Sequence, residues 1–158
     1  MRTFFLVLSL LFLSIACAQN SPPSDPPPGS ATSVSRTAAE PEIYEAVFRY
    51  QFDHNASAIQ KRAEKYCLSL PGERTPDAQF LQRFGDHHPP VVAADQCERK
   101  GGQSLFFRIQ RLDWHKDNEV WVRGGYWEGN LSSSIELYRV LHENGKWVVK
   151  GARMEAIS

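Results

Sequence analysis

The sequence has no excess of charge of either sign, since 18 Lys and Arg residues balance 18 Asp and Glu residues. Loss of an N-terminal leader that contains Arg2 would leave a net charge of about −1. A chain of this charge lacks the basic field that attracts nucleic acid and the basic cluster that attracts anionic lipid. We therefore expect no nucleic-acid partner, and no membrane contact through a charged surface.

The sequence also lacks the common catalytic signatures. It contains no Gly-x-Ser-x-Gly elbow, no Gly-rich phosphate loop and no His-Glu-x-x-His motif. The densest cluster of metal-capable side chains is Asp86-His87-His88, and adjacent loop histidines do not readily point at one ion. We therefore predict no catalytic residue, no metal ligand and no cofactor, and a role other than catalysis is favoured.

Long hydrophobic runs are missing as well. The apolar run at residues 4–15 is too short to span and anchor as a transmembrane helix. It follows the positive charge of Arg2 and precedes small residues, which is typical of an export signal. Residues 1–18 are therefore predicted to direct the chain to the periplasm or cell envelope.

The end of this export signal fits two cleavage patterns. Ser14-Ile15-Ala16-Cys17 resembles a bacterial lipobox, in which a small residue precedes a lipid-bearing cysteine, although Ser14 stands where that pattern usually has Leu. Ala16-Cys17-Ala18 also fits the small-x-small rule of ordinary signal peptidase, which would cut after Ala18. The first cleavage would anchor the protein to a membrane through Cys17, whereas the second would remove that cysteine.

Residues 19–40 have a composition that cannot build a hydrophobic core. They are rich in Pro and Ser, and they contain a single β-branched aliphatic residue and no aromatic one. We predict a disordered linker whose prolines extend its first half. Residues 41–158 are then expected to form one domain, with enough chain for a single hydrophobic core.

Cysteine is scarce, with three residues in the chain. Cys17 belongs to the processing region, which leaves Cys67 and Cys97 as an even pair. Because exported proteins fold under oxidising conditions, a disulfide between Cys67 and Cys97 is the simplest prediction. Two free thiols or a metal site are the alternatives.

Hydrophobic periodicity predicts helices first and strands later. Helical spacing begins at Pro41 and ends near residue 54. A second helix is expected after Thr75, which can cap its first turn. Alternating residues predict a strand at 66–70, and a further short strand is expected at 91–97.

The second half of the sequence is predicted to be β-structure. Alternation recurs from residue 105 onward, and Asn144-Gly145 is typical of the type I′ turn that joins two hairpin strands. The expected fold is α+β, with an N-terminal helix packed on a curved antiparallel sheet of about four strands.

The order of these elements resembles the NTF2-like and cystatin-like α+β families. The residue match is confined to the closing hairpin, Tyr138-Arg-Val-Leu-His-Glu-Asn-Gly-Lys-Trp-Val-Val149. The resemblance implies a curved antiparallel sheet wrapped around a helix, with room for a pocket. It carries over no catalytic residue.

One predicted strand carries the strongest candidate binding residues. Trp121, Arg123 and Trp127 share one face of this strand, and Val120 and Val122 share the other. If the valines cover the helix, the two tryptophans and Arg123 line the opposite surface and can contact a ligand or a partner. If both faces are covered, the same residues belong to the core.

Two functions are compatible with these features. An exported interaction protein of the cell envelope would bind a partner protein, or itself, through the aromatic sheet face. Alternatively, a cup-shaped sheet would bind a small apolar ligand against Trp121, Arg123 and Trp127. The interaction role is favoured, because a small exported domain without a catalytic cluster needs no chemistry.

Overall fold

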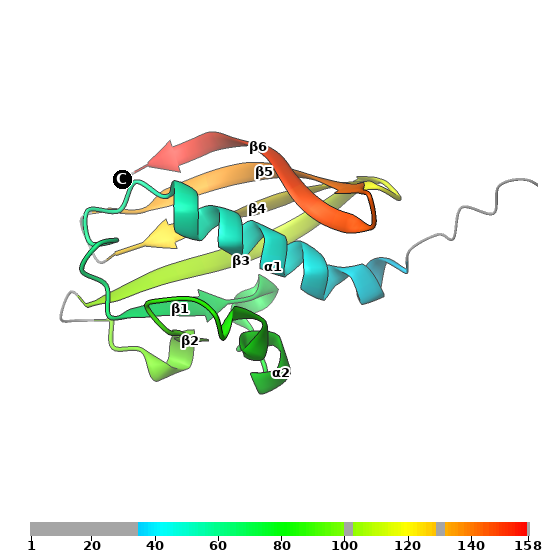
Figure 1. Ribbon diagram of the computed structural model, residues 1–158. Coiled ribbons are helices and arrows are strands. Elements are labelled where there is room, and N and C mark those ends of the chain that lie inside the picture. The colour runs from blue at the N-terminus through cyan, green and yellow to red at the C-terminus, as the bar shows by residue number, and fades with distance from the viewer. Residues whose placement is uncertain (1–34, 100–102, 129–131, 158) are drawn as a thin grey trace, which may run out of the picture. The chain divides into compact units, whose positions relative to one another are not determined.

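A six-stranded mixed sheet dominates the structure. The computed structural model of the protein describes residues 35–99, 103–128 and 132–157, which fall in one compact unit. Helix α1 (Arg36–His54) lies across one face of the sheet (Figure 1). In spatial order the strands are β2 (Val91–Ala93), β1 (Lys65–Ser69), β3 (Ser104–Lys116), β4 (Glu119–Trp127), β5 (Ser134–Glu143) and β6 (Lys146–Ile157).

The predicted fold class was wrong in its sheet. Instead of about four antiparallel strands behind a helix, the described chain is mostly sheet, and β1 pairs in parallel with both β2 and β3. Parallel neighbours require a long connection. The chain between β1 and β3 supplies it through η1 (Pro71–Glu73), α2 (Ala78–Leu81), η2 (Gln82–Phe84), β2 and η3 (Ala94–Gln96).

Strand β1 shows why the sheet is wider than expected. Its residues Tyr66, Cys67 and Leu68 are buried in succession, which is the pattern of a strand covered on both faces. In the sheet this strand lies between β2 and β3. The alternating strands β3 to β6 account for the antiparallel part alone.

Helix α1 begins at Arg36, inside the segment that was predicted to be a linker, and Pro41 lies within the helix. Ala38 and Ala39 favour helix, and Ala39 is buried against the core. The first turn is therefore stabilised by packing as well as by propensity. The predicted export signal, the linker up to residue 34 and Cys17 lie outside the described residues.

An aromatic core fills the space between α1 and the sheet. The ring centroid of Phe52 lies 5.0 Å from those of Tyr66 and Phe107, and 5.7 Å from that of Phe84. These four rings come from α1, β1, β3 and η2. The cluster therefore joins the helix to both the parallel and the antiparallel part of the sheet.

Asp77, and not Thr75, caps α2. Its side chain accepts a hydrogen bond from the backbone N–H of Phe80 at 2.7 Å, which satisfies one of the free donors of the first turn. The Thr75 hydroxyl instead donates to Asp95 at 3.3 Å. Thr75 therefore joins the segment before α2 to η3.

The hairpin between β5 and β6 turns at Asn144-Gly145, as predicted. Both residues have positive φ, 51° and 76°, which the type I′ turn requires. Two irregularities interrupt the pairing of β6 with β5, because Lys150 and Glu155 each have no partner in the register. Strand β6 therefore contains two bulges along the margin of the sheet.

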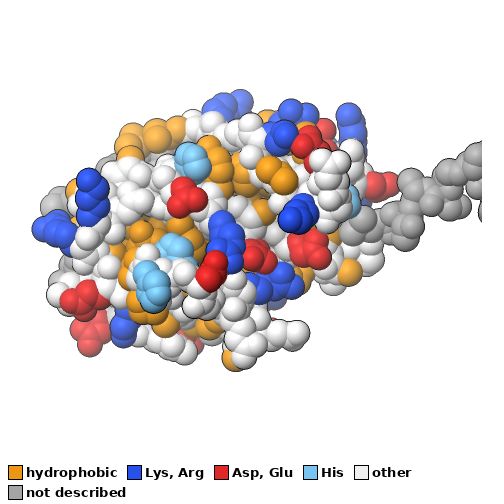
Figure 2. Space-filling model, in the orientation of Figure 1, with side chains coloured by type: hydrophobic (Ala, Val, Ile, Leu, Met, Phe, Trp, Pro, Cys, Tyr) orange, Lys and Arg blue, Asp and Glu red, His pale blue; other side chains and the backbone are white. Residues whose placement is uncertain are grey.

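The helix-covered face of the molecule shows no region of a single charge. Blue and red side chains are interspersed over it (Figure 2), which agrees with the balanced composition. Within the described ranges, neither α-helix is long and apolar enough to cross a membrane.

Candidate functional site

The valine side of β4 faces the helix. Val120 and Val122 are fully buried in the core, whereas Trp121, Arg123 and Trp127 are partly exposed on the opposite face of the sheet. This is the arrangement in which the tryptophans are available to another molecule. Trp121 and Trp127, however, lie in two separate environments.

Trp121 lies in the middle of this opposite face, among paired charges. Its neighbours across the sheet are Asp113 on β3 and Arg139 on β5. Arg139 forms an ion pair with Glu119 at 2.7 Å, and Arg111 forms one with Asp113 at 2.8 Å. The hydrogen bond from Arg139 is the main reason that the pKa of the Glu119 carboxyl lies below its usual value.

Arg123 is occupied by neighbouring side chains. Its Nε lies 2.8 Å from a carboxylate oxygen of Glu155 on β6. A second guanidinium nitrogen donates a hydrogen bond to the side chain of Gln110 on β3. Arg123 therefore links β4 to β3 and β6 across the sheet face.

Trp127 lies six residues from Trp121, which corresponds to about 20 Å along an extended strand. Its ring forms a T-shaped pair with Phe106, with ring centroids 5.1 Å apart. The guanidinium carbon of Arg99 lies 6.0 Å from the Trp127 ring centroid. Trp127 thus belongs to a different environment from Trp121.

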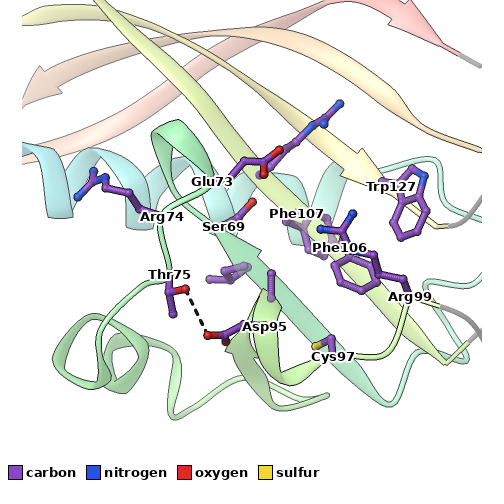
Figure 3. Close-up of a pocket in the computed structure, with 13 residues that line it drawn as sticks. Ser69, Glu73, Arg74, Thr75, Asp95, Cys97, Arg99, Phe106, Phe107 and Trp127 are labelled. Atoms are coloured by element: carbon purple, nitrogen blue, oxygen red, sulfur yellow. Dashed lines mark hydrogen bonds between the residues drawn. The ribbon is translucent and has the colours of Figure 1, made fainter.

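That environment is a cavity of about 370 Å³ beside β1, β3 and the end of β4. Trp127, Phe106 and Arg99 gather at one side of it, and Thr75 and Asp95 approach each other at another (Figure 3). The lining also includes residues of η1 and η3. The full set is Leu68, Ser69, Glu73, Arg74, Thr75, Ala94, Asp95, Cys97, Arg99, Phe106, Phe107, Arg108 and Trp127.

The charges of the cavity are mixed, with arginine in excess. Three arginines line it against two carboxylates, those of Glu73 and Asp95. Arg74 donates from Nε to the backbone oxygen of Pro71 at 3.1 Å. Arg108 differs, because its Nε is buried and has no hydrogen-bond partner in the part of the chain that the structure describes.

Sequence reasoning did not single out Arg99, Phe106 and Arg108, which line the cavity. The signal for two of them was present, since Phe106 and Arg108 alternate with the core residues Leu105 and Phe107. Alternation places them on the face opposite the helix. It carries no information about η1 and η3, which provide the other walls of the cavity.

The disulfide between Cys67 and Cys97 is confirmed. The two Cα atoms are 6.4 Å apart, and the bond links β1 to the residue after η3. Cys97 also lines the cavity. The disulfide therefore holds one wall of the cavity against the sheet, and neither sulfur is a free nucleophile or metal ligand.

In the Asp86-His87-His88 cluster, Asp86 and His87 contact neighbouring residues of the protein. Asp86 lies 3.1 Å from Arg49, whose hydrogen bond lowers the pKa of the Asp86 carboxyl. The His87 ring packs 4.6 Å from that of Phe52, and its Nδ1 lies 2.8 Å from the backbone oxygen of Pro89. Among residues 35–99, 103–128 and 132–157, no three His, Cys, Asp or Glu side chains are grouped as a metal site.

No protein-family model, curated protein or solved structure matches this chain. The resemblance to NTF2-like and cystatin-like domains therefore stays a prediction. The same is true of the export signal and of the interaction role.

Proposed function

We propose that this chain is an exported, non-catalytic interaction protein of the cell envelope. Its contact site is the Trp121 surface, which we define as Trp121, Leu137, Leu141 and Val148 on the sheet face opposite α1. The observation that supports it is the exposure of a tryptophan in the centre of that face, where Trp121 is partly open to solvent. Tryptophan is enriched among the residues that dominate protein–protein binding.

Aliphatic side chains extend the surface around Trp121. Leu137 and Leu141 flank Arg139, the residue opposite Trp121, so both lie diagonally across from the indole. Val148 pairs with Leu141 on the next strand and is 41% exposed. The result is a partly apolar area that a second chain could cover.

The charges on this face suit a protein partner. Each of Arg111, Arg123 and Arg139 is already paired with a carboxylate on the same face. These pairs remove the net positive field that nucleic acid or anionic lipid would require. Arginines around a tryptophan also match the usual composition of protein interfaces.

The proposed location rests on the leader. We expect export through residues 1–18, with a lipid on Cys17 that tethers the domain to a membrane. Intact mass of the exported protein tests this, because lipidation adds acyl mass to a chain that begins at Cys17. A chain that begins at Gln19, with Cys17→Ser leaving membrane association unchanged, would contradict the anchor.

Photo-crosslinking tests the contact site. The full chain is exported with p-benzoylphenylalanine in place of Val148, and, as a matched control, in place of the exposed Glu64 outside the surface. We expect a discrete adduct from position 148 that Trp121→Ser weakens several-fold. The size of the adduct, together with light scattering of the purified protein, distinguishes a second copy from another protein. The absence of an adduct at 148, or equal adducts at 64, would contradict the proposal.

A further inference from the structure

We propose that the cavity beside β1, β3 and β4 binds a small, flat organic anion. The ring system of the ligand would lie against Phe106 and Trp127, and its anionic group would meet Arg108. This site goes beyond the proposed interaction role, because it uses none of the residues of the Trp121 surface. The two proposals can therefore fail independently.

The aromatic wall is preformed. Phe106 and Trp127 are directly opposite each other on β3 and β4, and their rings already hold a T-shaped arrangement with centroids 5.1 Å apart. Both residues are partly exposed, so a face of this pair is open to the cavity. A planar ligand can pack there at a lower entropic cost, because the two rings are already arranged.

Arg108 supplies the reason for a negative charge. Its Nε is buried, yet it lacks an acceptor within the described ranges, and a buried donor without a partner is costly. Neither Glu73 nor Asp95, the two carboxylates that line the cavity, forms an ion pair with Arg108 among the described residues. A carboxylate or similar anion in the cavity, which Arg108 lines, would pair with its guanidinium through charge-assisted hydrogen bonds.

Arg99 also favours an anionic ligand in the cavity. Its guanidinium lies over the Trp127 ring, so a positive charge is located next to the aromatic wall. The lining still carries one more arginine than carboxylates, with Arg74, Arg99 and Arg108 against Glu73 and Asp95. A cationic ligand would therefore meet an excess of arginine in the cavity lining.

The size of the cavity restricts the ligand to a small molecule. A volume of about 370 Å³ lies at the lower end of the range for small-molecule pockets, which begins near 300 Å³. One or two fused rings with a single anionic group fit this space. Longer polymers would extend beyond the walls that η1 and η3 provide.

Calorimetric titration of the full chain tests the site with two matched probes, 2-naphthoate and its neutral analogue 2-naphthamide. We expect naphthoate to bind and naphthamide to bind at least about tenfold more weakly, since the amide lacks the charge that Arg108 requires. Arg108→Gln should weaken naphthoate at least about tenfold. The control Arg111→Gln, which changes an exposed arginine on the same strand, should leave the affinity unchanged.

A second pair of variants keeps the test decisive if Arg108→Gln does not fold. Trp127→Leu should weaken naphthoate about tenfold, whereas Trp121→Leu should not. Equal affinity for the two probes, no binding of naphthoate at millimolar concentration, or equal losses in Trp121→Leu and Trp127→Leu would overturn the proposal. Loss of crosslinking in Trp121→Ser with naphthoate binding retained would support both sites as separate.

Discussion

Gln51 on α1 donates a hydrogen bond from its side-chain nitrogen to the backbone oxygen of Arg108 on β3, 3.5 Å away. Gly124 on β4 lies beside this contact, and a Cβ atom there would lie 2.5 Å from the same oxygen and 2.9 Å from the Gln51 nitrogen. Because Gly124 has no side chain, α1 can approach the sheet closely enough for Gln51 to reach the backbone of Arg108 on β3.

The first prediction concerns Gly124→Ala. Because the added methyl would meet a backbone oxygen that cannot move freely, we expect the free energy of unfolding to fall by about 1 to 3 kcal/mol. Urea denaturation of the full chain measures it. Gly151→Ala is the matched control, since a Cβ there meets nothing within 4 Å, and its effect should stay within about 0.5 kcal/mol. Equal stability of the two variants would contradict the close contact.

Local features of the fold were predictable from the sequence. The Asn144-Gly145 turn depends on two residues that tolerate positive φ, and the disulfide depends on an even pair of cysteines, so neither needs knowledge of distant parts. The position of β1, in contrast, depends on distant parts of the chain. Its pairing with β2 and β3 joins segments separated by one short α-helix and several 3₁₀ helices, and nothing in Tyr66–Leu68 encodes that partner choice.

The candidate site was predictable only in part. The alternation along β4 placed Trp121, Arg123 and Trp127 on one face, but it could not show that Arg123 is held by Glu155. Glu155 lies at a bulge in β6, which the alternation of the sequence does not predict. The cavity at Trp127 also depends on η1 and η3, whose positions follow from tertiary packing.

The second prediction concerns acid stability. Glu128, after β4, accepts hydrogen bonds from the Ser57 hydroxyl and from the backbone N–H of Ile59, the latter at 3.1 Å. Burial would raise the pKa of Glu128, but hydrogen bonds from Ser57, Ser132 and the backbone outweigh it and hold the pKa below the usual value. The stabilisation is thus present above the unfolded-state pKa and is lost as pH falls through the lowered one.

Glu128→Gln should therefore reduce the free energy of unfolding by about 1 kcal/mol at pH 7. The difference from the parent should shrink as the pH falls through the lowered pKa of the parent carboxylate, where Glu128 takes up its proton. Thermal or urea unfolding at several pH values measures this, with the exposed Glu64→Gln as control. A difference that stays constant from pH 7 to pH 3 would contradict the role of the Glu128 charge.

The third prediction concerns the disulfide. Cys67 and Cys97 are separated by 30 positions, and the loop-entropy relation then gives a stabilisation of about 3 to 4 kcal/mol. In a Cys17→Ser background, changing both cysteines to Ala should lower the free energy of unfolding by about that amount. Thiol titration of the unreduced, denatured Cys17→Ser parent should find no reactive thiol. Two reactive thiols would disprove the bond.

The fourth prediction concerns the aromatic core. Phe52→Ala should cost about 3 to 5 kcal/mol, because it removes contacts with rings from β1, β3 and η2 at once. Met154→Ala is the comparison, since Met154 is 51% exposed and its truncation leaves no enclosed cavity. Urea denaturation measures both. A loss below about 1 kcal/mol for Phe52→Ala would show that the core is not continuous across these elements.

The two bulges in β6 bear on aggregation. A long strand at the margin of a sheet can recruit strands from other molecules, and β6 is twelve residues long. Its unmatched residues, Lys150 and Glu155, both carry charge, and each is paired with a side chain of the protein's own sheet. An incoming strand would meet an interrupted ladder and would have to displace these pairs. The irregular spacing of β6 should therefore keep concentrated protein from polymerising through this strand.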